Sequence, residues 1–265
     1  MARRACTVPL KKIMADRIGI RDLDGQSIVA LVSGGLDSVT FTRWAHDHGV
    51  TVHGCTANLG QPDEANIGDI ETRMTQAGAA TVTLVDGRED LARAGVLLLI
   101  CGGSYEGGYL NTTGIARAVT TRKALPVLKT HGVNVLSHGA TGRGNDQTRF
   151  QLYANMLDPT IRVYAPWRDP EFLAQFPGRA EMIDYCESKA IPVRATRDKP
   201  YSTDANLLGL THEAGKLEQL DVGPRFITPQ FGVHPQDAPD TTTRVAIGFE
   251  HGVPVRVNGQ SLSLV

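Results

Sequence analysis

The feature that most constrains this chain is the string Ser33-Gly34-Gly35-Leu36-Asp37-Ser38, which stands between a β-branched apolar run, 28–32, and a helical pattern. A strand that ends in small residues and turns into a helix directs free backbone N–H groups at one point, together with the positive end of the helix dipole. An anion is stabilised at such a point. Because two glycines leave the backbone open to close approach, the pattern predicts a phosphate-binding loop.

The string differs from the common phosphate loop of kinases and GTPases. That loop ends in Gly-Lys-Ser or Gly-Lys-Thr, and no lysine follows the glycines here. Ser-Gly-Gly-x-Asp-Ser instead resembles the PP-loop of ATP pyrophosphatases, which cleave ATP between the α and β phosphates. The alternative is an ordinary Asx or glycine turn before a helix. The apolar run before the string and the helical pattern after it favour the nucleotide site.

The composition limits the class of protein and of partner. A chain of 265 residues with 41% hydrophobic content can bury a sizeable core. A net charge of −1 gives no electrostatic reason to expect nucleic acid or an anionic membrane as partner. The longest apolar run, 95–101, is too short to cross a membrane, and the N-terminus has no apolar stretch of signal-peptide length. We therefore expect a cytoplasmic protein with small-molecule substrates.

The cysteines and histidines show no metal-site spacing. The four cysteines, Cys6, Cys55, Cys101 and Cys186, are scattered, which fits neither a zinc site nor a disulfide framework, so we interpret them as reduced thiols, mostly in the core. The eight histidines show no ligand spacing with carboxylates. No structural metal is expected.

Short apolar strand patterns alternate with helical patterns, which predicts an α/β fold with a doubly wound parallel sheet. The expected strands are 28–33, 50–56, 81–85 and 133–137, and the expected helices are 36–48, 64–77, 88–100 and 113–130. Pro126 must kink or divide the last helix.

Three segments follow from this pattern. An N-terminal arm is expected over 1–26, a nucleotide-binding domain over 27–165 and a smaller α+β substrate domain over 166–265. Within the last, 224–240 is rich in proline and glycine and predicts an irregular connector, whereas 244–264 predicts β-hairpins.

Ligands bind at the carboxyl ends of parallel strands, so the loops after Val32, Cys55 and Leu136 should converge on one crevice. The loop after Leu136 has three glycines within six residues, and polar side chains follow at the start of a helix near Asp146. An ordinary helix start, capped by Asn145 or Asp146, is the alternative. Beside the phosphate loop, this segment predicts a substrate shelf.

Six segments in order along the chain together resemble the argininosuccinate synthase family. The longest are His-Gly-Ala-Thr-Gly-Arg-Gly-Asn-Asp-Gln at 138–147 and Tyr-Ser-Thr-Asp-Ala-Asn-Leu-Leu-Gly-Leu-Thr-His-Glu at 201–213. The others are 33–38, 56–64, 109–117 and 165–168, and the first of the two long segments extends to 150.

The resemblance implies a PP-loop fold of the adenine nucleotide alpha hydrolase type and a two-step ligation in arginine biosynthesis and the urea cycle. The ureido oxygen of citrulline attacks the α phosphate of ATP to give citrullyl-AMP and pyrophosphate. The amine of aspartate then displaces AMP and forms argininosuccinate. Mg2+ would neutralise the phosphates, and positioning rather than acid or base chemistry would dominate.

The resemblance also implies roles for individual residues. The catalytic residues would be Asp37, Ser38 and Asp146. The ATP site would comprise Leu31, Val32, Ser33, Gly34, Gly35, Leu36, Asp37, Ser38, Val39, Ala57, Gly139, Thr141, Asp146 and Asp204. Aspartate would contact Thr141, Asn145 and Asp146. Citrulline would contact Tyr109, Asn145, Arg149, Ser202, Thr211 and Glu213.

Several of these residues have a structural alternative. Arg149 lies three positions after Asp146 and could form a helix ion pair with it. Tyr109 could be a packed aromatic residue, and Ser202 with Asp204 could cap a turn.

The chain departs from the family pattern in two ways. Val39 stands where the family has a serine, so a hydroxyl that would bind phosphate is absent. The chain also stops at Val265, before the family segment that supplies further citrulline contacts and the oligomer helix, so we expect a truncated substrate domain.

Three functions therefore stay open. The first is the ligation of citrulline and aspartate, for which a homo-oligomer is one possible assembly. The second is enzymatic action on another substrate, either by the same ligation or by another PP-loop chemistry such as amidation or thiolation. The third is a non-catalytic nucleotide-binding paralogue.

Overall fold

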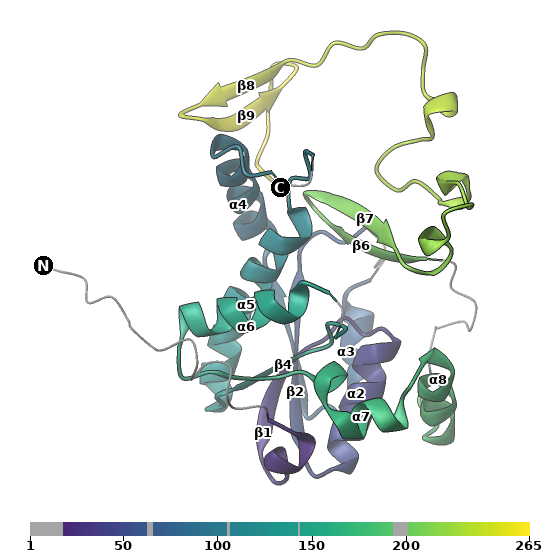
Figure 1. Cartoon of the computed structure of the whole chain (residues 1–265). Helices are drawn as coiled ribbons and strands as arrows, with labels where there is room; N and C mark the ends of the chain where they lie inside the picture. Colours follow the sequence, from purple (N-terminus) through teal and green to yellow (C-terminus); the bar gives the residue numbers. More distant parts are fainter. Residues whose placement is uncertain (1–17, 63–65, 105–106, 143, 193–200) are drawn as a thin grey trace, which may run out of the picture. The chain divides into compact units, whose positions relative to one another are not determined.

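A computed structural model describes residues 18–62, 66–104, 107–142, 144–192 and 201–265 of the chain (Figure 1). Most of the predicted N-terminal arm, including Cys6, lies outside these residues, as do Arg143 and Lys199. The chain forms two compact units. The first comprises the described residues within 1–57, 66–85 and 120–197, and the second those within 58–65, 86–119 and 198–265.

The first unit is built on a five-stranded sheet. Its strands are β1 (Ser27–Leu31), β2 (Thr51–Asn58), β3 (Thr81–Asp86), β4 (Val135–His138) and β5 (Arg162–Tyr164), in the order β3-β2-β1-β4-β5. The pairs β1–β2, β1–β4 and β4–β5 are parallel. The four predicted strands are confirmed within a few residues, and β5 is an addition.

Helices cover both faces of this sheet, which confirms the doubly wound fold (Figure 1). Alternate residues of β1 point to opposite faces, so Ile28 and Ala30 enter one core cluster and Val29 the other. The first cluster is shared with α2 (Leu36–Asp47), α3 (Gly68–Gln76), α7 (Pro170–Gln175) and α8 (Arg179–Ser188). The second is shared with α5 (Thr112–His131) and α6 (Asp146–Leu157).

Helix α5 runs through Pro126 as one continuous element, so of the two predicted effects, a kink or a division, Pro126 does not cause the division. The thiols of Cys55 and Cys186 are buried as predicted, but Cys101 is exposed, because it follows the last turn of α4 (Arg88–Ile100) rather than facing a core.

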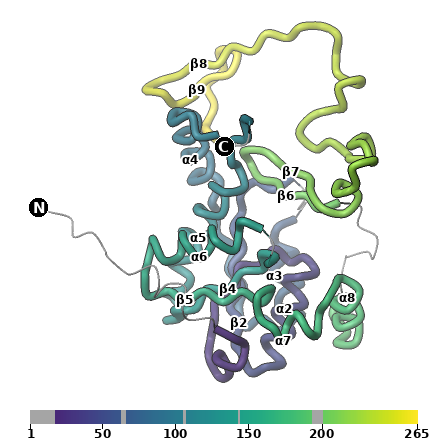
Figure 2. Tube along the Cα trace, in the orientation of Figure 1, coloured from purple at the N-terminus to yellow at the C-terminus, as the bar shows by residue number. Residues whose placement is uncertain are grey.

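The second unit contains α4, the first turns of α5 and two antiparallel sheets. One is the hairpin β6 (Ser202–Asn206) and β7 (Gly209–Glu213), two strands that the sequence did not predict. The other comprises β8 (Ile247–Glu250), β9 (Val253–Val257) and β10 (Gln260–Ser261) and confirms the terminal hairpins. These strands lie beside the end of α4, where Gly252 approaches Ile100 (Figure 2).

The remaining elements are short turns of 3-10 helix. They are η1 (Ile20–Leu23), η2 (Pro166–Arg168), η3 (Gly215–Glu218), η4 (Pro224–Phe226) and η5 (Pro235–Asp237). The last two interrupt the predicted irregular connector. No helix in the described part of the chain has both the length and the hydropathy needed to cross a membrane.

The two compact units interleave along the chain, whereas the predicted segments 1–26, 27–165 and 166–265 do not. Helices α7 and α8, which follow residue 165, pack in the core of the first unit. The predicted domain boundaries therefore remain a prediction, and they do not coincide with the two compact units of the structure.

Candidate functional site

The phosphate loop begins where β1 ends, as the sequence predicts. Gly34 has a φ of +68°, a conformation that residues with a side chain rarely adopt. The Ser33 N–H donates to Ser38 Oγ at 3.0 Å, and the two hydroxyl oxygens lie 3.3 Å apart. Helix α2 then starts after Gly35, so its first free N–H groups belong to this loop.

The loop offers mostly backbone groups to a ligand. The side chains of Val32, Leu36 and Val39 lie in the hydrophobic core, with Val39 only 2% exposed. The Val39 N–H donates to the Gly35 carbonyl at 3.0 Å. The side chain of Val39 therefore gives no support to the predicted nucleotide contact. Valine replaces the serine of the family at a position that faces the core.

Strand β4 brings the second loop to the same edge of the sheet. Leu31 at the end of β1 is in register with both Cys55 of β2 and His138 of β4. Ala57 follows on β2, next to Thr56, whose hydroxyl donates to the Val32 carbonyl at 2.7 Å. The ends of these three strands converge as predicted, and the strand order reverses between β1 and β4, where ligands bind in such sheets.

The loop after β4 is held at both ends. The buried His138 ring stacks on Phe150 with 4.7 Å between centroids, and Gln147 Nε2 donates to the Ala140 carbonyl at 2.5 Å. A side chain at Gly142 would place its Cβ 2.9 Å from the Trp167 carbonyl oxygen. The glycine is needed because the loop passes so close to backbone.

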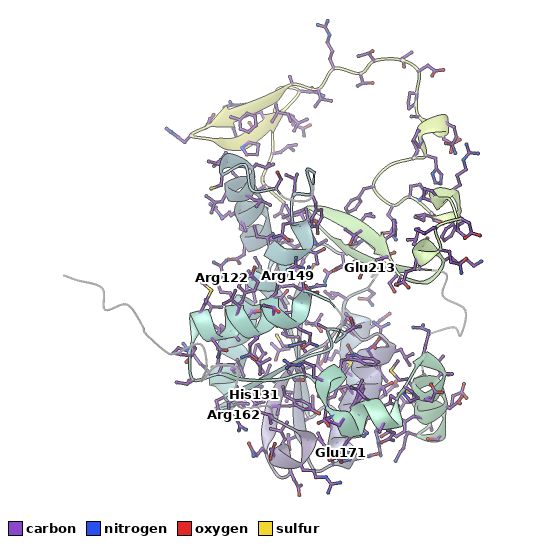
Figure 3. The ribbon with its side chains drawn as sticks, viewed as in Figure 1. Arg122, His131, Arg149, Arg162, Glu171 and Glu213 are labelled. Atoms are coloured by element: carbon purple, nitrogen blue, oxygen red, sulfur yellow. The ribbon has the colours of Figure 1, made fainter. Side chains whose placement is uncertain are left out.

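Helix α6 presents the charged pair of this loop. Arg149 Nη1 donates to Asp146 Oδ1 at 2.9 Å, and both side chains are about one-fifth exposed. The structural alternative for Arg149, which is labelled in Figure 3, is thus realised, in a half-buried setting. Asn145 precedes the helix but makes no side-chain capping bond to the described residues. Gly139, Thr141 and Asn145 are exposed.

In the second unit, the β6–β7 hairpin groups four predicted residues on one face. Ser202 pairs across the hairpin with Glu213, and Asp204 pairs with Thr211. Alternate residues of a strand point to the same face, so these four side chains share one side (Glu213 is labelled in Figure 3). Thr203 and His212 occupy the other side, with 2.9 Å between Thr203 Oγ1 and His212 Nδ1. Ser202 and Asp204 therefore lie in a strand of this hairpin and do not cap a turn, which was the structural alternative.

Arg117 of α5, which was not among the predicted site residues, contacts one of them. Its Nη2 donates to Asp204 Oδ2 in an ion pair whose side chains are 24% and 26% exposed. Asn206 Nδ2 also donates to the Thr112 carbonyl at 3.5 Å, and the Leu207 N–H donates to the Leu59 carbonyl at 2.8 Å.

Tyr109 precedes the same helix start, and its hydroxyl accepts from the Thr113 N–H at 3.3 Å. The hairpin and the first turns of α5 thus form one group. A signal for Arg117 existed in the sequence, since it closes the family segment 109–117.

The structure therefore brings the predicted residues together in two groups, one in each unit. The first holds Leu31–Val39, Ala57, Gly139, Thr141, Asn145, Asp146 and Arg149. The second holds Tyr109, Ser202, Asp204, Thr211 and Glu213.

Thiol chemistry finds little support among the three cysteines that the structure describes. Burial raises the pKa of Cys55 to about 12, and a thiol acts as a nucleophile only as its thiolate. Cys186 is buried too, and burial likewise raises its pKa. Cys101 belongs to the other unit. This arrangement disfavours the thiolation alternative.

The residues present fit a Mg2+ ion that arrives with phosphates. Among the residues that the structure describes, no group of three or more His, Cys, Asp or Glu side chains is arranged to hold a metal ion. Mg2+ bound to a nucleotide needs only one or two protein carboxylates. Asp37, half-buried in the first turn of α2, supplies such a carboxylate at the loop.

Comparisons with known proteins point to one family. Residues 27–192 match a model described as arginosuccinate synthase N-terminal HUP domain, and residues 201–265 match the C-terminal domain of the same enzyme. An argininosuccinate synthase of Rhodopirellula baltica is 46% identical over 240 residues, which cover 90% of this chain and 59% of that protein. One of Thermotoga petrophila is 39% identical over 233 residues, which cover 88% and 56%.

The chain thus spans between 56% and 59% of the length of these relatives. Among solved structures, a predicted subunit of tRNA methyltransferase from Methanocaldococcus jannaschii is similar at 14% identity, over 62% of this chain and 88% of that one, with a TM-score of 0.38.

Proposed function

The chain belongs to the argininosuccinate synthase family, and from this premise we propose that it is an ATP-dependent ligase that joins citrulline to aspartate. One observation carries the proposal. A phosphate loop that offers mostly backbone groups and a half-buried carboxylate–guanidinium pair follow adjacent strands, β1 and β4, at the point where the strand order reverses.

In the first step, the ureido oxygen of citrulline attacks the α phosphorus of ATP. A new O–P bond forms, the bond between the α phosphorus and the bridging oxygen breaks, and its electron pair leaves with pyrophosphate. The N–H groups of Gly34–Ser38 bind the phosphates, and Asp37 would hold the Mg2+ that neutralises part of their charge. The first turn of α2 adds its dipole to the same point.

In the second step, the amine of aspartate attacks the ureido carbon. A C–N bond forms, the C–O bond to AMP breaks, and the amine loses a proton. Thr141, Asn145 and Asp146 bind aspartate, which the exposure of Thr141 and Asn145 supports. Such a reaction gains most of its rate from alignment of the reactants.

Citrulline carries both a carboxylate and an ammonium group. Arg149 binds the carboxylate, since a guanidinium pairs with two oxygens at once. In the second unit, Glu213 is the ammonium contact that the family resemblance implies, and Ser202 and Thr211 share its face of the hairpin. Arg149 is pre-oriented by its ion pair with Asp146.

The test is pyrophosphate release by the purified 265-residue chain with ATP and Mg2+. The assay contains citrulline and aspartate together, each alone, and neither. We expect release that requires citrulline, and argininosuccinate only when aspartate is also present. No release under any condition, with ATP still bound, would contradict the proposal and favour the non-catalytic paralogue or another substrate.

Arg149→Ala sharpens the test. Loss of a charge-assisted hydrogen bond of about 1.5–3 kcal/mol should raise the KM for citrulline by about 10-fold or more. Arg93→Ala is the matched control, because Arg93 forms a helix ion pair with Glu89 on α4, where both side chains are more than half exposed. An unchanged KM in Arg149→Ala would remove Arg149 from the citrulline site.

A further inference from the structure

A guanidinium lies against the centre of the phosphate loop. It belongs to Arg73 in the second half of α3. A Cβ built on Gly34 would lie 2.9 Å from Arg73 Nη2 and 3.1 Å from Arg73 Nε. Gly34 is buried although Ser33 and Gly35 on either side of it are exposed. The glycine thus leaves the space that the guanidinium fills.

Core packing holds Arg73 at this place. Ile70 precedes it by one helical turn, and Ile70 Cγ2 would lie 3.1 Å from the same Cβ. Ile70 and Met74 are almost fully buried in the cluster that also contains Leu36 of α2. The turn of α3 that carries Arg73 is therefore fixed against the helix that the loop opens, and both belong to the first unit.

The phosphate loop has no cationic side chain of its own to pair with a bound phosphate. Residues 33–38 contain one carboxylate, Asp37, and no lysine or arginine. The common phosphate loop supplies a lysine of its own to the β and γ phosphates. A guanidinium is the side chain best suited to replace it, because its planar set of N–H donors matches phosphate oxygens.

We propose that Arg73 binds the β and γ phosphates of ATP and stabilises the departing pyrophosphate. This inference rests on the proposed function for the identity of the reaction. When the bond from the α phosphorus to the bridging oxygen breaks, its electron pair adds charge to pyrophosphate. The Arg73 guanidinium lies beside Gly34, so its positive charge adds to the stabilisation that the backbone N–H groups of the loop give.

The test compares Arg73→Met with the unsubstituted 265-residue chain. Methionine retains an apolar stem that packs beside Ile70 but removes the charge. Calorimetry measures the binding of inorganic pyrophosphate, ATP and AMP, each with Mg2+. We expect Arg73→Met to weaken pyrophosphate and ATP binding by about 10-fold to 100-fold, to leave AMP binding within about 2-fold, and Arg73→Lys to recover part of the loss.

The matched control is Arg21→Ala. Arg21 lies in the same unit, is 81% exposed and forms a surface ion pair with Glu171. It should leave all three affinities unchanged. Thermal melting of each variant identifies any loss of folding, and a loss of AMP binding equal to that of pyrophosphate would overturn the proposal in favour of a structural role.

The outcomes separate the two proposals. Pyrophosphate binding that is equal in wild type and Arg73→Met overturns the role of Arg73, whether or not the chain makes argininosuccinate. If Arg73→Met selectively loses pyrophosphate binding but the unsubstituted chain releases no pyrophosphate from ATP, the role of Arg73 is supported and the ligase function is overturned. A wild-type chain that binds neither pyrophosphate nor ATP overturns both.

Discussion

At the scale of single residues, the predicted site depends on backbone more than on side chains. Gly34 and Gly142 show two forms of this dependence. Gly34 has a positive φ and faces a guanidinium, whereas Gly142 faces a backbone carbonyl. A flexible arginine can move away from an added methyl group, but a carbonyl of η2 cannot move without displacing its turn.

Gly142→Ala should therefore destabilise the first unit. The added Cβ would lie 2.9 Å from the Trp167 carbonyl oxygen, and overpacking of this kind costs about 1–3 kcal/mol. Urea unfolding followed by tryptophan fluorescence measures the change. Gly144→Ala is the control, because its Cβ would meet Thr141 Oγ1 only at 4.0 Å. Equal midpoints for the two variants would show that the loop adapts.

At the scale of secondary-structure elements, the β6–β7 hairpin depends on its contacts to α5. A two-stranded hairpin alone is marginally stable in water. Arg117 forms an ion pair with Asp204 on the face that groups the predicted substrate residues. The orientation of that face therefore depends on a residue outside the hairpin.

Arg117→Ala should loosen the hairpin. A half-buried carboxylate would lose this ion pair, and we expect amide hydrogen exchange over 202–213 to accelerate by about 10-fold, somewhat more than a surface ion pair would explain. Arg93→Ala, which removes an exposed ion pair from α4 of the same unit, should leave this exchange unchanged. Similar acceleration in both variants would contradict a specific role for Arg117.

The strands and helices also show how far the sequence could predict the structure. The strands and helices up to residue 138 were predictable because apolar β-branched runs alternate with helical patterns, and the family resemblance is confirmed by the family models. The hairpin was not predictable as strands. Ser-Thr-Asp-Ala-Asn in β6 is short and polar, so it reads as a loop.

The parts of the candidate site that consist of a local sequence motif were predictable. The phosphate loop and the loop after β4 are local strings, so the topology of a parallel sheet places them at one edge. Arg117 and Arg73 act through contacts between distant segments, 117 with 204 and 73 with 34. Arg117 lies in the family segment 109–117, but no local pattern shows which distant residue Arg117 or Arg73 contacts.

At the scale of the whole molecule, the two units differ in their cores. Both hydrophobic clusters lie in the first unit. Among the described residues of the second unit, the nearly fully buried apolar side chains are Leu59, Leu91, Ala92, Ala116, Val119 and Ala205, half of them alanines. The same unit exposes more than half of Leu97, Leu99, Ile100 and Phe249.

The second unit should therefore unfold first. Both tryptophans, Trp44 and Trp167, lie in the first unit, so their fluorescence reports that unit alone. Hydrogen exchange over 88–100 and 202–213 reports the second. In urea, we expect exchange protection of these segments to be lost at a lower concentration than the tryptophan transition, because less apolar area is buried there.

Pyrophosphate with Mg2+ should raise only the tryptophan transition, since the phosphate loop belongs to the first unit. At 100 times its Kd, a ligand that binds only the folded state adds about 2.7 kcal/mol. The exchange midpoint over 202–213 should stay unchanged, and AMP serves as the comparison ligand. Coincident transitions that shift together with pyrophosphate would instead show one cooperative folding unit, in which the small core of the second is stabilised by the first.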